Sequence, residues 1–212
     1  MRLVNSSKTL AVELVENPNR FRARGGYERM LDLLRQGEAA SEVKSILREH
    51  PEAAGDVLWT VAQLDDVGAF ASDAGRYLSS TDKATAAYAM EIVLRGAKRP
   101  GEIRVALDCL SQVDVAVREH AVRTLAGEGM ERLTEILNAA GGVWSELSDE
   151  LGPHHFQIAM VEDLLRHPSL GFHVIGVVLA SLIYERNKSA IQVLRHADES
   201  WIRDYAAWLA GE

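Results

Sequence analysis

Apolar residues recur along the chain at the spacing of an amphipathic α-helix, in which one stripe of side chains faces a core. The full i, i+3, i+4, i+7 pattern occurs in four segments, which span Tyr27–Leu34, Ile103–Leu110, Leu133–Ala140 and Ile202–Leu209. No stretch shows the strict alternation of a half-buried strand, and no Asn-Gly or Asp-Gly pair marks a hairpin. The pattern therefore predicts an all-α protein.

Prolines, glycines and capping residues divide this pattern into about a dozen short helices. A helix can begin at each of four prolines, because its first turn does not use the missing N–H; they are Pro51, Pro100, Pro153 and Pro168. The expected N-caps are Asp82, Asp114 and Ser200, and the expected C-terminal caps are Gly37, Gly96, Gly127, Gly141 and Gly211. No linker rich in Pro, Gly or Ser exceeds a few residues, and the one loose stretch runs from Asn17 to Gly26. We therefore expect one helical-repeat domain over residues 1–212, in which residues 1–26 form a peripheral helix and loop.

The most apolar stretch runs from Leu170 to Tyr184 and is interrupted by His173. It falls short of the ~20 residues that a helix needs to cross a bilayer, so it is expected to be the central buried helix of the fold. The N-terminus shows neither the apolar segment nor the cleavage site of a secretory signal. A cytoplasmic protein without a membrane partner is the expectation.

An internal repeat supports a particular helical architecture. A shift of 32 residues places Asp82 on Asp114, and a shift of 29 residues places Leu165-Arg166-His167 on Leu194-Arg195-His196. Two helices of about a dozen residues and two turns occupy roughly 30 residues, so this period is typical of stacked helical hairpins. An irregular helical bundle is the alternative.

The segment Asp114–Gly127 resembles the second helix of a HEAT repeat, in which an Asp caps the helix and an Arg near its start, here Arg118, can pair with that Asp. Asp198–Gly211 looks like a second copy, with Arg203, and Asp82–Val93 like a third that lacks the Arg. The resemblance covers residues from about 80 to the end and is closest to the short HEAT-like variety. It implies a right-handed α-solenoid of antiparallel helix pairs with a concave surface suited to interaction.

Residues for chemistry are few. The chain has no phosphate-binding loop, no dinucleotide fingerprint, no nucleophile elbow and no His-Glu-x-x-His, so we predict no catalytic residue, no cofactor and no metal site. His50, His167 and His196 each end a helical segment and are expected to bind free carbonyl groups there. His173, on an apolar face, is expected to be buried and hydrogen-bonded. Cys109 excludes an intramolecular disulfide, because it is the only cysteine.

Charge adds the most specific signal. The 31 acidic residues outnumber the 23 basic ones, and the net charge of −8 argues against nucleic acid and anionic membranes as partners. Residues 101–150 hold 10 acidic and 4 basic side chains, a balance of −6. This quarter contains a candidate partner-binding set, Trp144, Glu131, Glu135, Glu146, Asp149 and Glu150. Either these acids form a solvated face with Trp144 in the core, or Trp144 anchors a basic partner that the acids attract.

The composition, charge and missing chemistry favour a non-enzymatic protein-binding module of bacterial type. Its concrete form would be an immunity protein, which occludes a basic toxin domain with carboxylates that stand in for nucleic-acid phosphates. The alternative is a HEAT-like DNA glycosylase, a class that uses aromatic residues and an Asp on a concave face. Trp201, Asp204 and Trp208 could supply that set, but no basic stripe accompanies them.

Overall fold

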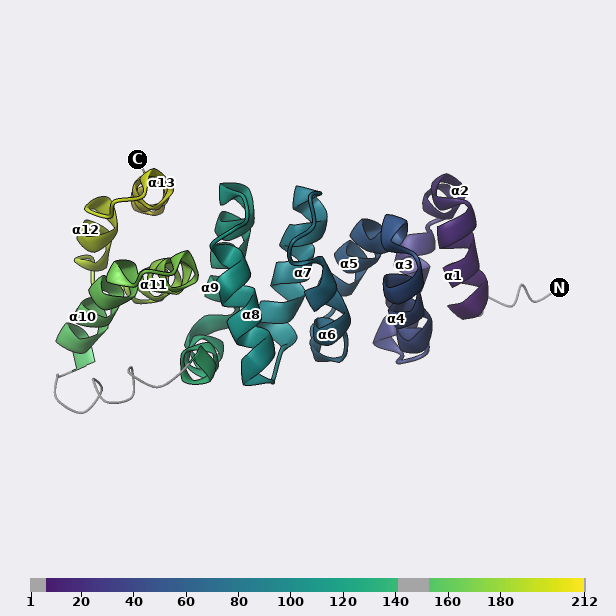
Figure 1. Ribbon diagram of the computed structural model, residues 1–212, viewed down its shortest axis with the longest axis horizontal. Coiled ribbons are helices and arrows are strands. Elements are labelled where there is room, and N and C mark those ends of the chain that lie inside the picture. The colour runs from purple at the N-terminus through teal and green to yellow at the C-terminus, as the bar shows by residue number, and fades with distance from the viewer. Residues whose placement is uncertain (1–6, 141–152, 212) are drawn as a thin grey trace. The chain divides into compact units, whose positions relative to one another are not determined.

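The computed structural model describes residues 7–140 and 153–211, and within the second range the side chains are described from Ile158 onward. Every element in these ranges is helical, which confirms the all-α prediction (Figure 1). The described residues form helices α1 to α13, in agreement with the expected dozen. Contacts group the chain into two compact units, residues 1–97 and 98–212. The single repeat domain expected over the whole chain stays a prediction.

The N-terminal unit contains seven α-helices and three short 3-10 turns. They are α1 (Ser7–Glu16), α2 (Pro18–Ala23), α3 (Gly26–Arg35), α4 (Ala40–Glu49), η1 (Pro51–Ala53), α5 (Ala54–Ala62), η2 (Gly68–Phe70), α6 (Ala71–Ala74), η3 (Gly75–Tyr77) and α7 (Lys83–Gly96). α1 packs on α2, α3 and α4, whereas α5 packs on α3, α4 and α7. α5 and α7 therefore form the centre of this unit with α3 and α4 around them.

Local sequence sets where α7 begins and how closely its end is packed. The Asp82 carboxylate accepts the backbone N–H of Thr85 at 2.8 Å, which confirms Asp82 as the N-cap. At the other end, a Cβ added to Gly96 would lie 2.8 Å from the Cα of Gly68, so only glycine permits this approach. Arg95 donates to the Ala62 and Leu64 carbonyls at 2.8 and 2.9 Å, and thereby binds the end of α5 to α7.

The C-terminal unit is built around its most apolar helix. Its helices are α8 (Pro100–Leu110), α9 (Val115–Ala140), α10 (Pro153–Arg166), α11 (Leu170–Ile183), α12 (Ala190–Arg195) and α13 (Ser200–Ala210). α11 packs against α8, α9, α10 and α12, and ten of its residues are buried. The expected central buried helix is confirmed. Contact with α8 is so close that a Cβ at Gly171 would overlap the Leu107 carbonyl oxygen.

Several of the expected helix boundaries are wrong, and the errors are local. Gly96 is the last residue of α7 and not its cap, and α11 begins at Leu170, two residues after Pro168. Gly141 lies outside the described residues. Gly127 does not end its helix; α9 continues past it and breaks at Gly129, whose φ of 82° and ψ of −172° are accessible only to glycine. Ser200 is the first residue of α13 and not its cap, because Glu199 occupies the cap position, where its side chain makes no capping hydrogen bond. Gly37 and Gly211, both with φ of 78°, do end their helices as expected.

None of the described helices has the length and apolar character that spanning a membrane requires.

Two glycine substitutions in this unit should change stability in opposite directions. Gly171→Ala places a methyl group against the α8 backbone and should lower the free energy of unfolding by about 2–3 kcal/mol. Gly127→Ala, in a helical position with open space around it, should raise that free energy by about 0.5–1 kcal/mol. Urea unfolding followed by circular dichroism measures both. Equal effects of the two substitutions would contradict the close packing of α11 on α8.

Candidate functional site

The structure describes only part of the partner-binding set predicted from the sequence. Trp144, Glu146, Asp149 and Glu150 lie outside the described residues. Glu131 and Glu135 are exposed in the second part of α9, one turn apart and therefore on one face. Glu135 forms an ion pair with Arg132 at 2.6 Å. The docking patch that these residues were expected to build stays a prediction.

The residues of the glycosylase alternative are not brought together. Trp201 is buried in the C-terminal unit, with 5% of its surface exposed. Asp204 is exposed on the same helix, and Trp208 is 62% exposed and rests against the ring of Tyr205. The buried tryptophan belongs to the core, so it cannot face a ligand together with the other two.

A hollow in the N-terminal unit has the composition of a binding site. It has a volume of about 920 Å³ and is lined by residues from α2, α3, α5, α7 and the turns between them. We call it the aromatic–acidic pocket. Its walls contain four aromatic side chains, Tyr27, Trp59, Tyr77 and Tyr88. They also contain four carboxylates and one guanidinium, those of Glu28, Glu52, Asp56, Asp82 and Arg22.

Helix periodicity on α5 explains how the pocket receives two of its side chains. Val57, Leu58 and Val61 are buried and bind α5 into the core. Asp56 and Trp59 lie three residues apart on the remaining face, where Asp56 is half-buried and Trp59 is 39% exposed. Because the apolar face of α5 is buried, the opposite face places the Asp56 carboxylate and the Trp59 indole ring in the wall of the hollow.

Tyr27 is the most constrained residue of the pocket. Its ring packs edge-on against Phe21 and Trp59, with centroids 5.0 and 5.6 Å apart. The side chain is 8% exposed, yet its hydroxyl forms a well-aligned hydrogen bond with no described residue. Burial raises the pKa of Tyr27 to about 12, and the nearby Asp56 adds to this rise while Arg22 opposes it. The pocket thus contains a neutral hydroxyl that lies next to both Asp56 and Arg22.

The charged groups give the pocket a negative balance, four carboxylates against one guanidinium. Hydrogen bonds from Thr85 lower the pKa of Asp82, and the backbone N–H of Glu52, with help from His50, lowers the pKa of Glu52. Both acids are therefore ionised at neutral pH. Arg22 lies 3.6 Å from Asp56, and its guanidinium carbon is 5.9 Å from the centre of the Tyr27 ring. Carboxylates beside aromatic faces are the surroundings that a cationic ligand prefers.

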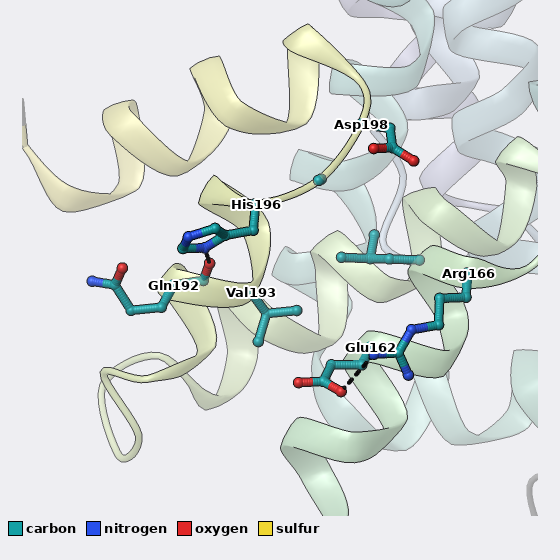
Figure 2. A pocket seen from close by; sticks show the side chains of 8 residues that line it. Glu162, Arg166, Gln192, Val193, His196 and Asp198 are labelled. Carbon is teal, nitrogen blue, oxygen red and sulfur yellow. Dashed lines mark hydrogen bonds and ion pairs between the residues drawn. The ribbon is translucent and has the colours of Figure 1, made fainter.

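The C-terminal unit has a smaller hollow of about 440 Å³ (Figure 2). Three of its charged and polar side chains already have partners: Glu162 binds Arg166 at 3.0 Å, and the Nδ1 of His196 donates to the Gln192 carbonyl at 2.6 Å. The second bond confirms that His196 binds a free carbonyl at the end of α12. No Tyr or Trp is found among the described residues that line this hollow. It is therefore less suited to a ligand than the aromatic–acidic pocket.

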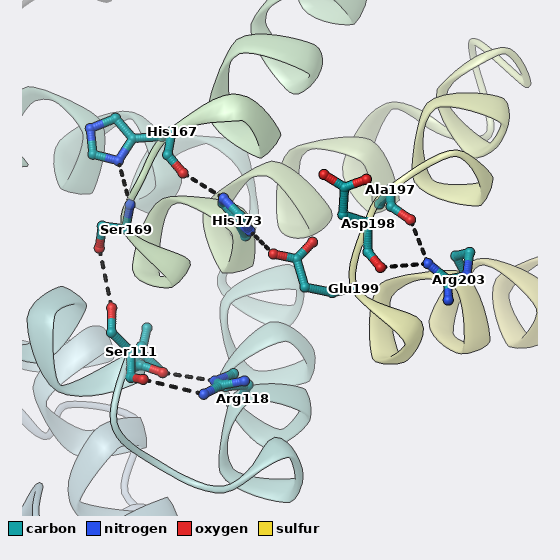
Figure 3. A network of polar contacts seen from close by, with 10 residues as sticks. Ser111, Arg118, His167, Ser169, His173, Ala197, Asp198, Glu199 and Arg203 are labelled. Atoms are coloured by element: carbon teal, nitrogen blue, oxygen red, sulfur yellow. Dashed lines mark hydrogen bonds and ion pairs between the residues drawn. The ribbon is translucent and has the colours of Figure 1, made fainter.

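A polar network nearby has Ser, His and carboxylate members, as a catalytic triad does (Figure 3). The Nδ1 of His173 lies 2.6 Å from Glu199, but its Nε2 donates to the His167 carbonyl at 2.6 Å. The second nitrogen is therefore occupied by backbone and cannot take a proton from a nucleophile. His173 is buried and hydrogen-bonded, as expected, and it connects the end of α10 to the start of α13.

Two arginines in Figure 3 donate to carbonyls at or just beyond the end of a helix. Arg118 donates to the Leu110 and Ser111 carbonyls at 2.8 and 3.4 Å, and burial lowers its pKa. Arg203 donates to the Ala197 and Asp198 carbonyls at 2.7 and 2.6 Å. Asp114 accepts the Ala116 N–H at 2.9 Å, which confirms it as a cap. In both segments that resemble HEAT helices an arginine thus binds carbonyls that precede its own helix, but Arg118 reaches the end of α8 whereas Arg203 reaches the turn after α12.

His50 and His167 were also expected to bind free backbone carbonyls, and the structure gives both rings other partners. The Nδ1 of His167 accepts the N–H of Ser169 at 3.1 Å, and the Nδ1 of His50 lies 3.2 Å from a Glu52 oxygen. Both residues do follow the last turn of a helix. Over the described residues, no three metal-binding side chains gather at one point.

A comparison with models of known protein families finds no match, and a comparison with curated proteins finds none either.

Sequence reasoning missed the aromatic–acidic pocket because its walls come from three distant segments, residues 22–28, 51–59 and 77–88. The only local signal was Trp59, which follows Asp56 by three residues on a helix whose other face is apolar. Such a pair indicates an exposed aromatic side chain next to an acid. It does not say which segments face that pair.

Titration of Tyr27 should be visible in the stability of the protein. The folded state keeps this proton to about pH 12, whereas the unfolded chain loses it near the ordinary tyrosine pKa of 10.0, so stability present below pH 10 is lost as the pH rises. Between about pH 9 and about pH 11 this loss should reach about 1 kcal/mol. In urea unfolding, the free energy of unfolding of Tyr27→Phe should fall over this pH range by about 1 kcal/mol less than that of the wild type.

Tyr184→Phe is the matched control, because Tyr184 lies in the C-terminal unit and outside the pocket. It should keep the wild-type dependence on pH. A Tyr27→Phe variant with the same alkaline fall as wild type would contradict the burial of the Tyr27 hydroxyl.

Proposed function

We propose that this protein is a non-enzymatic binding module that receives a basic segment of another protein in the aromatic–acidic pocket. The observation that carries this proposal is the combination, in one hollow, of four aromatic side chains with four carboxylates. A positive side chain can lie against a Tyr or Trp face while a carboxylate pairs with its charge. The same acids would repel an anionic ligand.

Trp59 supplies the apolar part of this recognition. Trp59 is 39% exposed, and its indole ring packs edge-on against the Tyr27 ring. This contact holds the ring in place while leaving part of it open to a partner. Rigid aromatic side chains dominate the energetics of many protein interfaces. The net charge of −8 attracts a basic partner from a distance, whereas the pocket selects the group that enters.

The proposal includes the HEAT-like α-solenoid implied by the sequence. Arg118 lies four residues after Asp114 and Arg203 five residues after Asp198, and both donate to carbonyls at or just beyond the end of the preceding helix. This shared contact is what a repeated helix pair would produce. Stacked helix pairs would also explain why the residues that line the aromatic–acidic pocket come from successive helices and the turns between them.

Two double substitutions test the location of the site. Glu52→Gln with Asp56→Asn removes two charges from the pocket, and Glu131→Gln with Glu135→Gln removes two from the exposed face of α9. With a hexa-arginine amide as probe, the first pair should weaken binding by about tenfold in isothermal titration calorimetry. The second pair is the control for net charge and should weaken it by less than about threefold.

A loss confined to the Glu131/Glu135 variant would overturn the pocket as the site and favour the acidic face instead. Equal losses in both variants would mean that the probe responds only to the net charge. Either outcome contradicts the proposal. Circular dichroism of each variant verifies that the helices are retained.

The finer form of the proposal is an immunity protein that acts in the cytoplasm of a bacterium and occludes a basic toxin domain. The gene next to the one encoding this chain should then specify a product that arrests growth when expressed alone. Co-expression of the wild-type chain should restore growth, and the Glu52/Asp56 variant should restore it less than the Glu131/Glu135 variant does. A neighbouring product without toxicity would rule out the immunity form.

A further inference from the structure

Arg22 occupies the aromatic–acidic pocket in a way that indicates what the pocket binds. It belongs to the last turn of α2, and 67% of its side chain is exposed. An exposed arginine has no structural need to fold back, yet this one lies over the Tyr27 ring and beside Asp56. The pocket therefore already holds one cation, contributed by its own chain.

The neighbouring arginines behave differently. Arg20 and Arg24 both approach Glu13, at 3.6 and 3.5 Å, and neither lines the pocket. Arg22 is thus the one arginine of this segment that reaches Tyr27 and Asp56 among the described contacts. Its position reflects the chemistry of the pocket and not a general attraction between α2 and nearby acids.

Arg22 is held weakly enough to leave. Its contact with Asp56 is an exposed ion pair at 3.6 Å, and such pairs contribute about 0–1 kcal/mol. A ligand with several contacts to the pocket can therefore replace it at small cost. Withdrawal of Arg22 would also remove the one positive charge from a wall that otherwise holds carboxylates.

The group that replaces Arg22 must satisfy the same surroundings. A guanidinium is flat, so it can lie on the Tyr27 ring, and its fork of N–H donors can pair with the Asp56 carboxylate. A further N–H can be accepted by the Tyr27 hydroxyl, the group with which the Arg22 guanidinium itself interacts. An ammonium group offers the charge without the flat surface and the fork.

We infer that the ligand of the aromatic–acidic pocket is an arginine side chain of the partner, which displaces Arg22 from the Tyr27 ring and Asp56. This inference rests on the proposed function, since it specifies the ligand of the same site. Arg22 is then an internal competitor, whose removal strengthens binding instead of weakening it.

The experiment compares Arg22→Gln with Arg24→Gln, which remove the same charge two residues apart. Both arginines are exposed, with 67% and 55% of their side chains accessible, so both variants should fold. Calorimetric titration with hexa-arginine amide should show about fivefold tighter binding to Arg22→Gln. Arg24→Gln should differ from wild type by less than about twofold. Titration with hexa-lysine amide should show weaker binding to all three proteins.

A third variant separates geometry from charge. Arg22→Lys keeps the positive charge but loses the fork and the flat surface, so displacement should become easier and binding of hexa-arginine amide tighter than in wild type. The indole N–H resonance of Trp59, assigned by its loss in Trp59→Phe, should shift on addition of N-acetyl-arginine amide. This second probe carries one basic side chain and reports the pocket directly.

The outcomes distinguish this inference from the proposed function. If hexa-arginine binding depends on Glu52 and Asp56 but Arg22→Gln and Arg24→Gln tighten it equally, the pocket is the site and displacement of Arg22 is wrong. Weaker binding to Arg22→Gln would show that Arg22 contacts the ligand, which also overturns displacement. If binding is insensitive to Glu52 and Asp56, both the site and this inference fail.

Discussion

The free carbonyl groups at the ends of short helices are the constraint on which this structure depends. A helix leaves its last four carbonyl oxygens without partners, and a fold of many short helices has many such ends. Arg95, Arg118 and Arg203 each extend to carbonyls at or just beyond the end of an earlier helix. Because a guanidinium has several donors in one plane, each contact satisfies an end and joins two helices at the same time.

The aromatic–acidic pocket is a consequence of the same way of building. The apolar face of α5 packs into the core, so Asp56 and Trp59 lie on the face that is turned away from it. Short turns before and after α5 then bring Tyr77 and the start of α7 to the edge of that face. A continuous pair of long helices would bury such a face completely. Short helices with turns between them leave a hollow in which side chains with charge and aromatic rings can gather.

The pocket and Arg22 together describe a site that is partly neutralised by its own chain. Four carboxylates in one hollow repel one another, and an internal guanidinium reduces that repulsion in the absence of a partner. The contact with Asp56 is largely exposed and therefore weak. A binding module can in this way hold acidic groups at high density without the cost in stability that unpaired charges impose.

The sequence by itself determined the helical class, the caps Asp82 and Asp114 and the buried helix that contains His173. These features depend on contacts within one or two turns or on the periodicity of apolar residues, which a sequence displays directly. The break at Gly129 in place of Gly127, and the start of α13 at Ser200, depended on small differences in backbone conformation that residue type does not resolve. Only the tertiary structure decided that Arg22, Tyr27, Asp56, Trp59 and Tyr88 line one hollow. The physical reason is that periodicity specifies which face of each helix is buried, whereas the identity of the helix that covers this face is set by packing between segments distant in the chain.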